Sequence, residues 1–304
     1  MAMLSRFKMK DIGACKTYLG MEIAREKQAI RLTQAKFTTH LLQDAGLWDA
    51  KSKPTLMEAG LEIEPADVPI RMEDFRRLVG KIQWLAVISR PDIAHATSRL
   101  ASVVTKPSEM AWIALKRVLR YLRGTVNEGL VYQGSGPLQG YSDANWAEGS
   151  SAKSMTGVIF MLNNGPIHWF TKRQSVVALS TCEAEYIAAS TATQDATWIG
   201  PHVQEIQGIA EPSPVPIWVD NQGAIALAKK TGWNRRTRHI NVRYQFVQKA
   251  IEDGTISMEY VPTDSQKADG LTKALKADKY GQWKALIGPF RGGKGADMDS
   301  EKGE

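Results

Sequence analysis

Four short motifs in the second half of the chain each place a carboxylate at the end of a segment with strand or helix periodicity. The motifs are YSDANW, STCEAEY, IWVDNQ and DSQKADGLTK, and their acids are Asp143, Glu185, Asp220 and Asp269. Carboxylates brought together repel one another unless cations lie between them. A fold that gathers these four acids would form a site for two divalent metal ions, the kind of site that supports phosphodiester chemistry.

Taken singly, each of these acids has an ordinary explanation. Asp143 suits the exposed face of an edge strand, and Asp220 suits the N-cap of a following helix. Glu185 suits the positive end of a helix, where Glu183 competes for the same role. Asp269 suits a solvated helix surface. The metal-site interpretation therefore depends on the acids acting together.

Composition is that of a globular protein. The chain has 304 residues, of which 43% are hydrophobic and 23% charged, and its net charge of +7 suits a polyanionic partner. Cys15 and Cys182 lie far apart, which argues against a zinc site and favours a reducing compartment. The first residues lack the apolar region of a signal peptide, and no apolar run reaches the roughly 20 residues of a membrane span. We therefore expect an intracellular chain that is neither secreted nor membrane-bound.

The first 137 residues predict a hairpin followed by helices. Alternating residues predict the hairpin over 18–32, and an amphipathic helix follows over 34–45. Residues 51–69 lack periodicity and predict a linker. Helical spacing then predicts three helices, over 75–88, 92–104 and 109–122, the last with Ser108 as its N-cap. A turn-rich boundary follows over 124–137.

The last of these three helices has a basic face. It carries Lys116, Arg117, Arg120 and Arg123 opposite its apolar residues. Such a face is either a solvated helix surface or a track for nucleic-acid phosphates. The residues alone leave both interpretations open.

The second part of the chain alternates strands and helices. The predicted strands are 139–146, 156–162, 166–170, 176–180, 216–220 and 256–261, and the predicted helices begin near Cys182, Gln222, Ile240 and Ser265. This order predicts an α/β fold with a mixed sheet covered by helices. Gly200 and Pro201 are expected to kink or break the long helix. Residues 291–304 are polar and Gly-rich, which predicts disorder.

Longer segments resemble a known family. Residues 138–275 resemble the RNase H domain of Ty1/copia-type retrotransposon Pol polyproteins, through GYSDANW, VALSTCEAEY, VDNQGAIALAK and EYVPTDSQKADGLTKAL. Upstream segments, among them FKMKDIGACKTYLGMEI and RLVGKIQWLAVISRPDIAHATSRLA, resemble the region of the same polyproteins that follows the polymerase centre. The resemblance covers residues 7 to about 276.

This resemblance implies a domain plan, an RNase H-like domain preceded by a mostly helical segment. Residues 1–57 would be a remnant of the reverse transcriptase palm or thumb, and 58–137 a helical thumb or connection region. Residues 138–276 would form the RNase H-like domain, and 277–304 a C-terminal extension. No Asp-Asp dipeptide occurs, so we do not expect DNA synthesis by this chain alone. The implied partners include the palm and fingers of the polymerase and other retroelement proteins. The implied location is a cytoplasmic retroelement particle or the nucleus.

The resemblance also implies the chemistry. The family's metal-binding acids fall on Asp143, Glu185, Asp220 and Asp269. They imply two Mg²⁺ ions, with Mn²⁺ as a substitute, which bridge the scissile phosphate of RNA in an RNA–DNA hybrid while water attacks. Cellular enzymes of this class have a histidine in the loop before the last acid. Residues 260–266 contain none, which predicts slower turnover.

Basic segments near the acids are candidate contacts for the hybrid. Residues 221–250 contain no acid. The candidates are Asn221, Arg235, Arg236 and Arg238, with a smaller group of Lys172, Arg173 and Gln174 in the turn before the long helix. The alternative is a solubilising loop and helix face.

The predicted function is that of a metal-dependent endonuclease of RNase H type. The alternative is a catalytically inactive nucleic-acid-binding or scaffold fragment of a degenerate retroelement. An integrase or transposase would place its acids in the order Asp, Asp, Glu. Because this chain has its glutamate second, the order disfavours that class.

Overall fold

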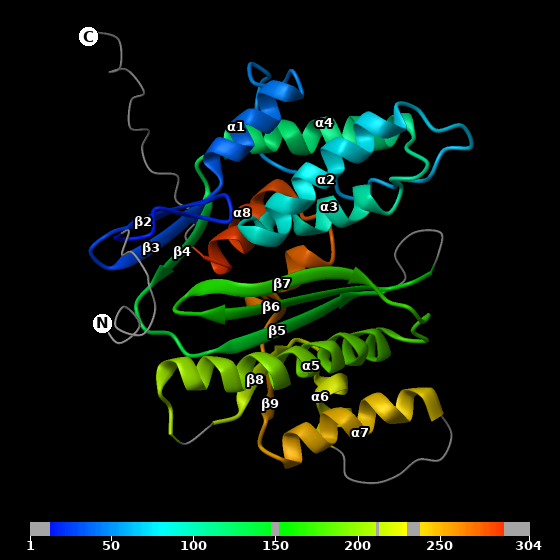
Figure 1. Ribbon diagram of the computed structural model, residues 1–304. Coiled ribbons are helices and arrows are strands. Elements are labelled where there is room, and N and C mark those ends of the chain that lie inside the picture. Colours follow the sequence, from blue (N-terminus) through cyan, green and yellow to red (C-terminus); the bar gives the residue numbers. More distant parts are fainter. Residues whose placement is uncertain (1–12, 147–151, 211–212, 230–237, 289–304) are drawn as a thin grey trace, which may run out of the picture.

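A five-stranded mixed sheet forms the centre of the protein (Figure 1). The computed structural model describes residues 13–146, 152–210, 213–229 and 238–288. The strands lie in the order β7-β6-β5-β8-β9, with bounds β5 Gln139–Asn145, β6 Met155–Leu162, β7 Gly165–Arg173, β8 Val215–Val219 and β9 Ile256–Tyr260. Strands β5, β6 and β7 pair antiparallel, whereas β8 and β9 add in parallel beside β5. This mixed sheet confirms the predicted α/β class.

Helices cover both faces of this sheet (Figure 1). One face packs against α5 (Thr181–Gln207), α6 (Gln222–Lys229) and α7 (Arg238–Glu252), and the other against α2 (Met72–Ile88), α3 (Ala94–Ala101) and α8 (Ala277–Leu286). Val158 and Phe160 of β6 belong to the first core, while Ile159 between them belongs to the second. The two-residue period of a strand sends alternate side chains to opposite faces, so one strand serves both cores.

A smaller antiparallel sheet joins the start of the chain to the residues before β5. Its strands are β1 (Thr17–Tyr18), β2 (Met21–Arg25), β3 (Ala29–Thr33) and β4 (Gly129–Gln133). The β2–β3 pair confirms the predicted hairpin. Strand β4 lies where only a turn-rich boundary was predicted. A Cβ at Gly129 would lie 2.1 Å from the Leu32 carbonyl oxygen, so the glycine permits the close pairing with β3.

The remaining elements are short or helical. They are α1 (Ala35–Asp44), α4 (Glu109–Gly124) and the 3-10 turns η1 (Pro91–Ile93), η2 (Thr263–Ser265) and η3 (Asp269–Leu271). The predicted N-cap of α4 is confirmed, because the Ser108 hydroxyl accepts a hydrogen bond from the Ala111 backbone N–H at 3.3 Å.

Three element predictions are wrong. Residues 176–180 form a loop rather than a strand, because Ser180 turns the chain to cap α5. The last helix begins at Ala277 and not at Ser265. The intervening residues form the turns η2 and η3, which leaves Asp269 in a tight turn. The second helix of the first part is shorter than expected, since a 3-10 turn precedes α3.

Helix α5 runs unbroken through Pro201, so the expected break does not occur. Ile199 and Val203 on either side are 4% and 8% exposed and pack into the core beneath the sheet. Their burial offsets the lost backbone hydrogen bond. Gly208, with a φ of +67°, then ends the helix in the left-handed conformation. No described helix, α5 included, combines the length and apolarity needed to cross a membrane.

The basic face of α4 holds the connecting segment that follows α1. Arg117 donates hydrogen bonds to Glu58 and Thr55 at 2.8 and 2.9 Å. Arg120 donates to the Lys51 carbonyl at 2.6 Å. The Arg123 guanidinium lies 4.5 Å from the centre of the Trp48 ring. These arginines therefore fix the irregular linker, which neither interpretation of the basic face anticipated.

A buried ion pair anchors the helical layer, which consists of α2, α3, α4 and α8 and shares one core. Arg90 is 1% exposed, and two of its nitrogens donate to the two carboxylate oxygens of Asp92, each at 2.8 Å. The Tyr121 hydroxyl donates to the same carboxylate at 2.7 Å. Burial alone would favour the neutral acid, but the charge of Arg90 and these hydrogen bonds lower the pKa of Asp92.

Helix α8 completes this network from the end of the chain. The Tyr280 hydroxyl lies 3.0 Å from that of Tyr121, and Lys284 donates to Tyr121 at 2.9 Å. Tyr280 and Trp283 are buried in the same core as α2 to α4. Residues 277–286, predicted to belong to a C-terminal extension, are thus part of the helical layer. The tail predicted to be disordered from 291 lies outside the described residues.

Replacing Asp92 tests this anchor. We expect Asp92→Ala to lower the free energy of unfolding by about 3–5 kcal/mol, because it leaves the Arg90 charge buried without its partner. Urea denaturation followed by circular dichroism measures the change. Asp44→Ala is the control, since it removes an exposed ion pair with Arg77 and Lys81 and should change stability little. Equal losses in the two variants would contradict the anchoring role.

Replacing Pro201 tests the strain in α5. We expect Pro201→Ala to raise the free energy of unfolding by up to about 3 kcal/mol, because alanine restores a helix donor and removes the clash of the proline ring. Thermal denaturation measures the effect, with the exposed Ala210→Gly outside the helix as a control that should show no gain. An unchanged or lower melting temperature for Pro201→Ala would show that the helix carries no such strain.

Candidate metal centre

Parallel pairing of β5 with β8 places Asp143 and Asp220 side by side. Tyr141 pairs with Trp218, and two residues further along each strand lie Asp143 and Asp220. Asp143 is within β5 and 4% exposed, while Asp220 directly follows β8. The carboxyl ends of neighbouring parallel strands meet at one edge of a sheet, which is where α/β proteins commonly build sites.

The first turn of α5 delivers the third acid. Ser180 accepts a hydrogen bond from the Glu183 backbone N–H at 3.1 Å, and the Glu183 carboxylate accepts one from the Leu179 N–H at 2.7 Å. This reciprocal capping fixes the start of the helix. Glu183 is therefore a capping residue, and Glu185 is 7% exposed and lies with the other acids.

Three of the predicted acids converge. One carboxylate oxygen from each of Asp143, Glu185 and Asp220 lies within 4.8 Å of the others. One Glu185 oxygen, Oε2, is buried and has no hydrogen-bond partner among the described residues. Carboxylate oxygens are the ligands that Mg²⁺ and Mn²⁺ prefer, and an unpartnered buried oxygen is costly without a cation. The donor set thus fits a divalent metal ion.

Asp269 lies outside this group of three but beside it. It forms an ion pair with Lys273, and its charge contributes to the raised pKa of Asp143. The Thr272 hydroxyl donates a hydrogen bond to Asp143. Thr272 and Lys273 follow Asp269 in the same turn, so this short segment supplies three polar groups to the site. Sequence reasoning missed the roles of Thr272 and Lys273, although their polar side chains at positions three and four after the acid were a usable signal.

Burial raises the pKa of the two most enclosed acids. The pKa of Asp143 rises to about 7, chiefly through burial and further through the charges of Asp269 and Asp220. The pKa of Glu185 rises to about 10, again through burial first and then through the charges of Asp143 and Asp220. Clustered carboxylates disfavour one another's ionised forms. Protons therefore stabilise this cluster wherever cations do not.

Buried Gln266 ties the turn of Asp269 to the sheet. Its side-chain nitrogen donates to the Ser142 carbonyl at 3.0 Å, and its side-chain oxygen accepts from the Ala268 N–H at 3.1 Å. Thr263 donates to the Asp220 carboxylate at 3.0 Å. These bonds position the segment that carries Asp269 against the ends of β5 and β8.

The predicted nucleic-acid contacts separate into different environments. Lys172 and Arg173 are exposed, but they end strand β7 rather than lying in a turn. Gln174 is 5% exposed and donates to Thr156 and to the Ala184 carbonyl, both at 3.0 Å. Asn221 accepts from the Ala224 N–H at 3.0 Å and so caps α6. Gln174 is thus buried and hydrogen-bonded within the protein, and its contact with nucleic acid stays a prediction.

The remaining predicted contacts are not described. Arg235 and Arg236 lie outside the described residues, and the side chain of Arg238 does too, although its backbone belongs to α7.

Three carboxylates converge where the mixed sheet of this α/β protein meets the first turn of α5, and they form an acidic site of the kind that binds metal ions. Residues 1–59 match the family model of the reverse transcriptase (RNA-dependent DNA polymerase). The chain is 35% identical over 294 residues to the retrovirus-related Pol polyprotein from transposon TNT 1-94 of Nicotiana tabacum, covering 93% of this chain and 22% of that protein. It is 33% identical over 295 residues to that from transposon RE2 of Arabidopsis thaliana, covering 95% and 20%.

The chain belongs to the copia-type retrotransposon Pol polyproteins. It spans about a fifth of the length of these curated relatives. Among solved structures, LC11-RNase H1 isolated from compost aligns with a TM-score of 0.35 and 16% identity, covering 44% of this chain and 91% of that one.

The raised pKa of Asp143 predicts a pH-dependent stability. Between pH 4 and 7 the folded metal-free chain binds more protons than the unfolded chain, so its stability falls as pH rises through this window. At pH 8 in EDTA, Asp143→Asn should therefore be more stable than the native chain by up to about 4 kcal/mol, since each pK unit is worth about 1.4 kcal/mol. At pH 4 the two should be nearly equal.

Urea denaturation at both pH values measures this difference. Asp49→Asn is the control, because Asp49 is exposed and far from the cluster in sequence. A gain for Asp143→Asn that is the same at pH 4 and pH 8 would contradict a raised pKa in the folded state.

Proposed function

We propose that this chain is a metal-dependent endonuclease that hydrolyses the RNA strand of RNA–DNA hybrids. The observation that carries the proposal is the convergence of Asp143, Glu185 and Asp220 at the end of β5. Membership of a polyprotein family with a reverse transcriptase supports it, because the hybrid is the product of copying RNA into DNA. A neighbouring solved structure is that of LC11-RNase H1 in complex with an RNA/DNA hybrid.

Each acid has a distinct part in the proposed site. Asp143 lies at the centre, enclosed and hydrogen-bonded by Thr272, and would bind cations through its carboxylate. Glu185 and Asp220 would complete the ligand set from α5 and from the end of β8. Asp269 would join them once its ion pair with Lys273 opens. Divalent cations bound there would neutralise the carboxylates and supply the Lewis-acid chemistry that phosphodiester hydrolysis needs.

The protein itself orients the reacting groups. Ala144 donates a backbone hydrogen bond to Glu185, so the carboxylate is held beside β5. Thr263 holds Asp220, and Gln266 holds the turn that carries Asp269. Rigid ligands of this kind favour the geometry in which water attacks in line with the leaving 3′ oxygen. Lys172 and Arg173 are exposed and available to the phosphates of the hybrid.

A cleavage assay tests the proposal. The native chain is incubated with Mg²⁺ and a hybrid whose RNA strand is labelled, and the products are separated on a denaturing gel. We expect RNA cleavage that EDTA abolishes and that Asp143→Asn lowers by about 100-fold or more, because the central ligand is lost. Single-stranded RNA of the same sequence should remain uncut.

The exposed Asp49→Asn serves as the matched control and should cut at the native rate. Binding of the hybrid without cleavage by the native chain would favour the alternative, a catalytically inactive nucleic-acid-binding fragment. Cleavage that survives in Asp143→Asn would exclude the proposed site.

A further inference from the structure

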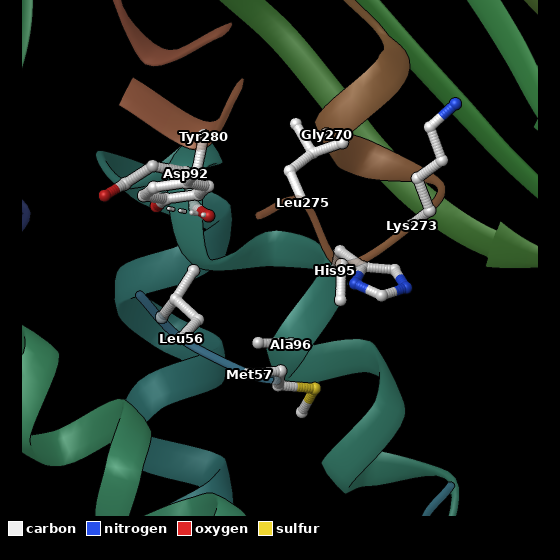
Figure 2. A pocket seen from close by; sticks show the side chains of 10 residues that line it. Leu56, Met57, Asp92, His95, Ala96, Gly270, Lys273, Leu275 and Tyr280 are labelled. Atoms are coloured by element: carbon white, nitrogen blue, oxygen red, sulfur yellow. Dashed lines mark hydrogen bonds between the residues drawn. The ribbon is translucent and has the colours of Figure 1, made fainter. Parts of the chain in front are cut away.

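A cavity lies between the helical layer and the acid cluster. Its volume is about 320 Å³, and its polar lining consists of Glu62, His95, Arg99, Asn145, Trp146 and Lys273. A smaller pocket adjoins it, lined by His95 and Lys273 as well as Tyr280, as Figure 2 shows. Lys273 reaches both the cavity and the carboxylates, since its charge lowers the pKa of Asp143 and Glu185. Lys273 therefore links the cavity to the proposed metal centre.

Positive charge dominates this lining. Arg99 and Lys273 bring two cations to the lining and Glu62 one acid, while Lys273 is also paired with Asp269 next to the cavity. His95 adds no charge at neutral pH, because burial and then the charge of Arg99 lower its pKa to about 3. A negatively charged group of small size suits this environment, and a phosphodiester is such a group.

Trp146 forms an exposed aromatic surface beside the cavity. Trp146 is 46% exposed, and its indole nitrogen donates a hydrogen bond to the Ala178 carbonyl at 3.0 Å. Ala178 is itself buried against Ala184 in the first turns of α5. The ring is therefore held against the loop before α5, in the turn that directly follows β5 and three residues after Asp143.

The loop that accepts this hydrogen bond extends the surface. Val176, Val177 and Leu179 are 41%, 49% and 83% exposed, which is unusual for three apolar residues in one short loop. The exposed Lys172 and Arg173 precede them at the end of β7. An apolar surface with basic residues next to it suits the sugar and base faces of a nucleic-acid strand and its phosphates.

We propose that Trp146 supports one nucleotide of the bound hybrid next to the cut position. Its sugar or base lies against the exposed indole, and its phosphate enters the cavity near Arg99 and Lys273. This assignment rests on the proposed function, because the hybrid is taken as the ligand. It gives the site a specific contact, built from the end of β5 and from α3, that the four acids do not supply.

Hybrid affinity tests the aromatic contact. Binding of a fluorescent RNA–DNA hybrid is measured by anisotropy in Ca²⁺, with gels confirming that the RNA stays intact. We expect Trp146→Ala to weaken binding about tenfold or more and Trp146→Phe to retain most of the affinity, because any aromatic ring offers a stacking face. The matched control is Trp198→Ala. Trp198 is 67% exposed and lies on α5, 13 residues after Glu185. This variant should bind like the native chain.

Salt dependence tests the phosphate contact. Arg99→Gln should reduce the slope of log Kd against log salt by about one charge. Because Arg99 is 5% exposed, its variant is first checked by thermal denaturation. If that variant does not fold, single methylphosphonate substitutions along each strand test the native chain instead. One neutralised position close to the cut should then weaken native binding and leave Trp146→Ala little further affected.

The outcomes separate this assignment from the proposed function. Native cleavage with unchanged affinity in Trp146→Ala overturns the nucleotide contact alone. Equal weakening in Trp198→Ala also overturns it, since the effect would not depend on position. Absence of both binding and cleavage by the native chain overturns the contact and the proposed function together.

Discussion

Repulsion among carboxylates is the constraint around which this structure is arranged. Asp143, Glu185 and Asp220 come from a strand, a helix and a strand end, yet their oxygens lie within 4.8 Å of one another. Each element is held by its own core contacts or caps, so the acids cannot move apart to relieve the repulsion. Either protons or cations must neutralise the carboxylates. Because the two compete for the same oxygens, metal binding depends on pH.

The helical layer contributes to the site as well as to the fold. Arg90, Asp92, Tyr121 and Tyr280 lock α8 against α2 to α4, and that layer packs against the turn η3 that carries Asp269. The cavity beside the acids exists because α3 lies opposite the end of β5. Segments that resemble reverse transcriptase and RNase H thus share one core, and the proposed nucleotide contact uses residues from both.

Sequence patterns predicted what is local and missed what is distant. The hairpin, the Ser108 cap and strands β5, β6 and β7 follow from periodicity and capping, which neighbouring residues determine. The burial of Gln174 could not be predicted, because its hydrogen bonds to Thr156 and Ala184 depend on how β6 and α5 pack together. Pro201 was expected to kink or break α5, because the sequence pattern does not show how deeply the neighbouring Ile199 and Val203 are buried. The burial of α8 depends on a network centred almost two hundred residues earlier, which no local signal records.

That separation along the chain has a consequence for synthesis. Tyr280 meets the backbone of Asp92 across 188 residues. At roughly 5–20 residues per second, the ribosome releases the second of these segments roughly 10 to 40 s after the first. During that interval α8 cannot yet pack against the Arg90–Asp92 pair, and water still reaches the pair from that side. Among the described residues, the helical layer is therefore the last part to close, although most of it is encoded first.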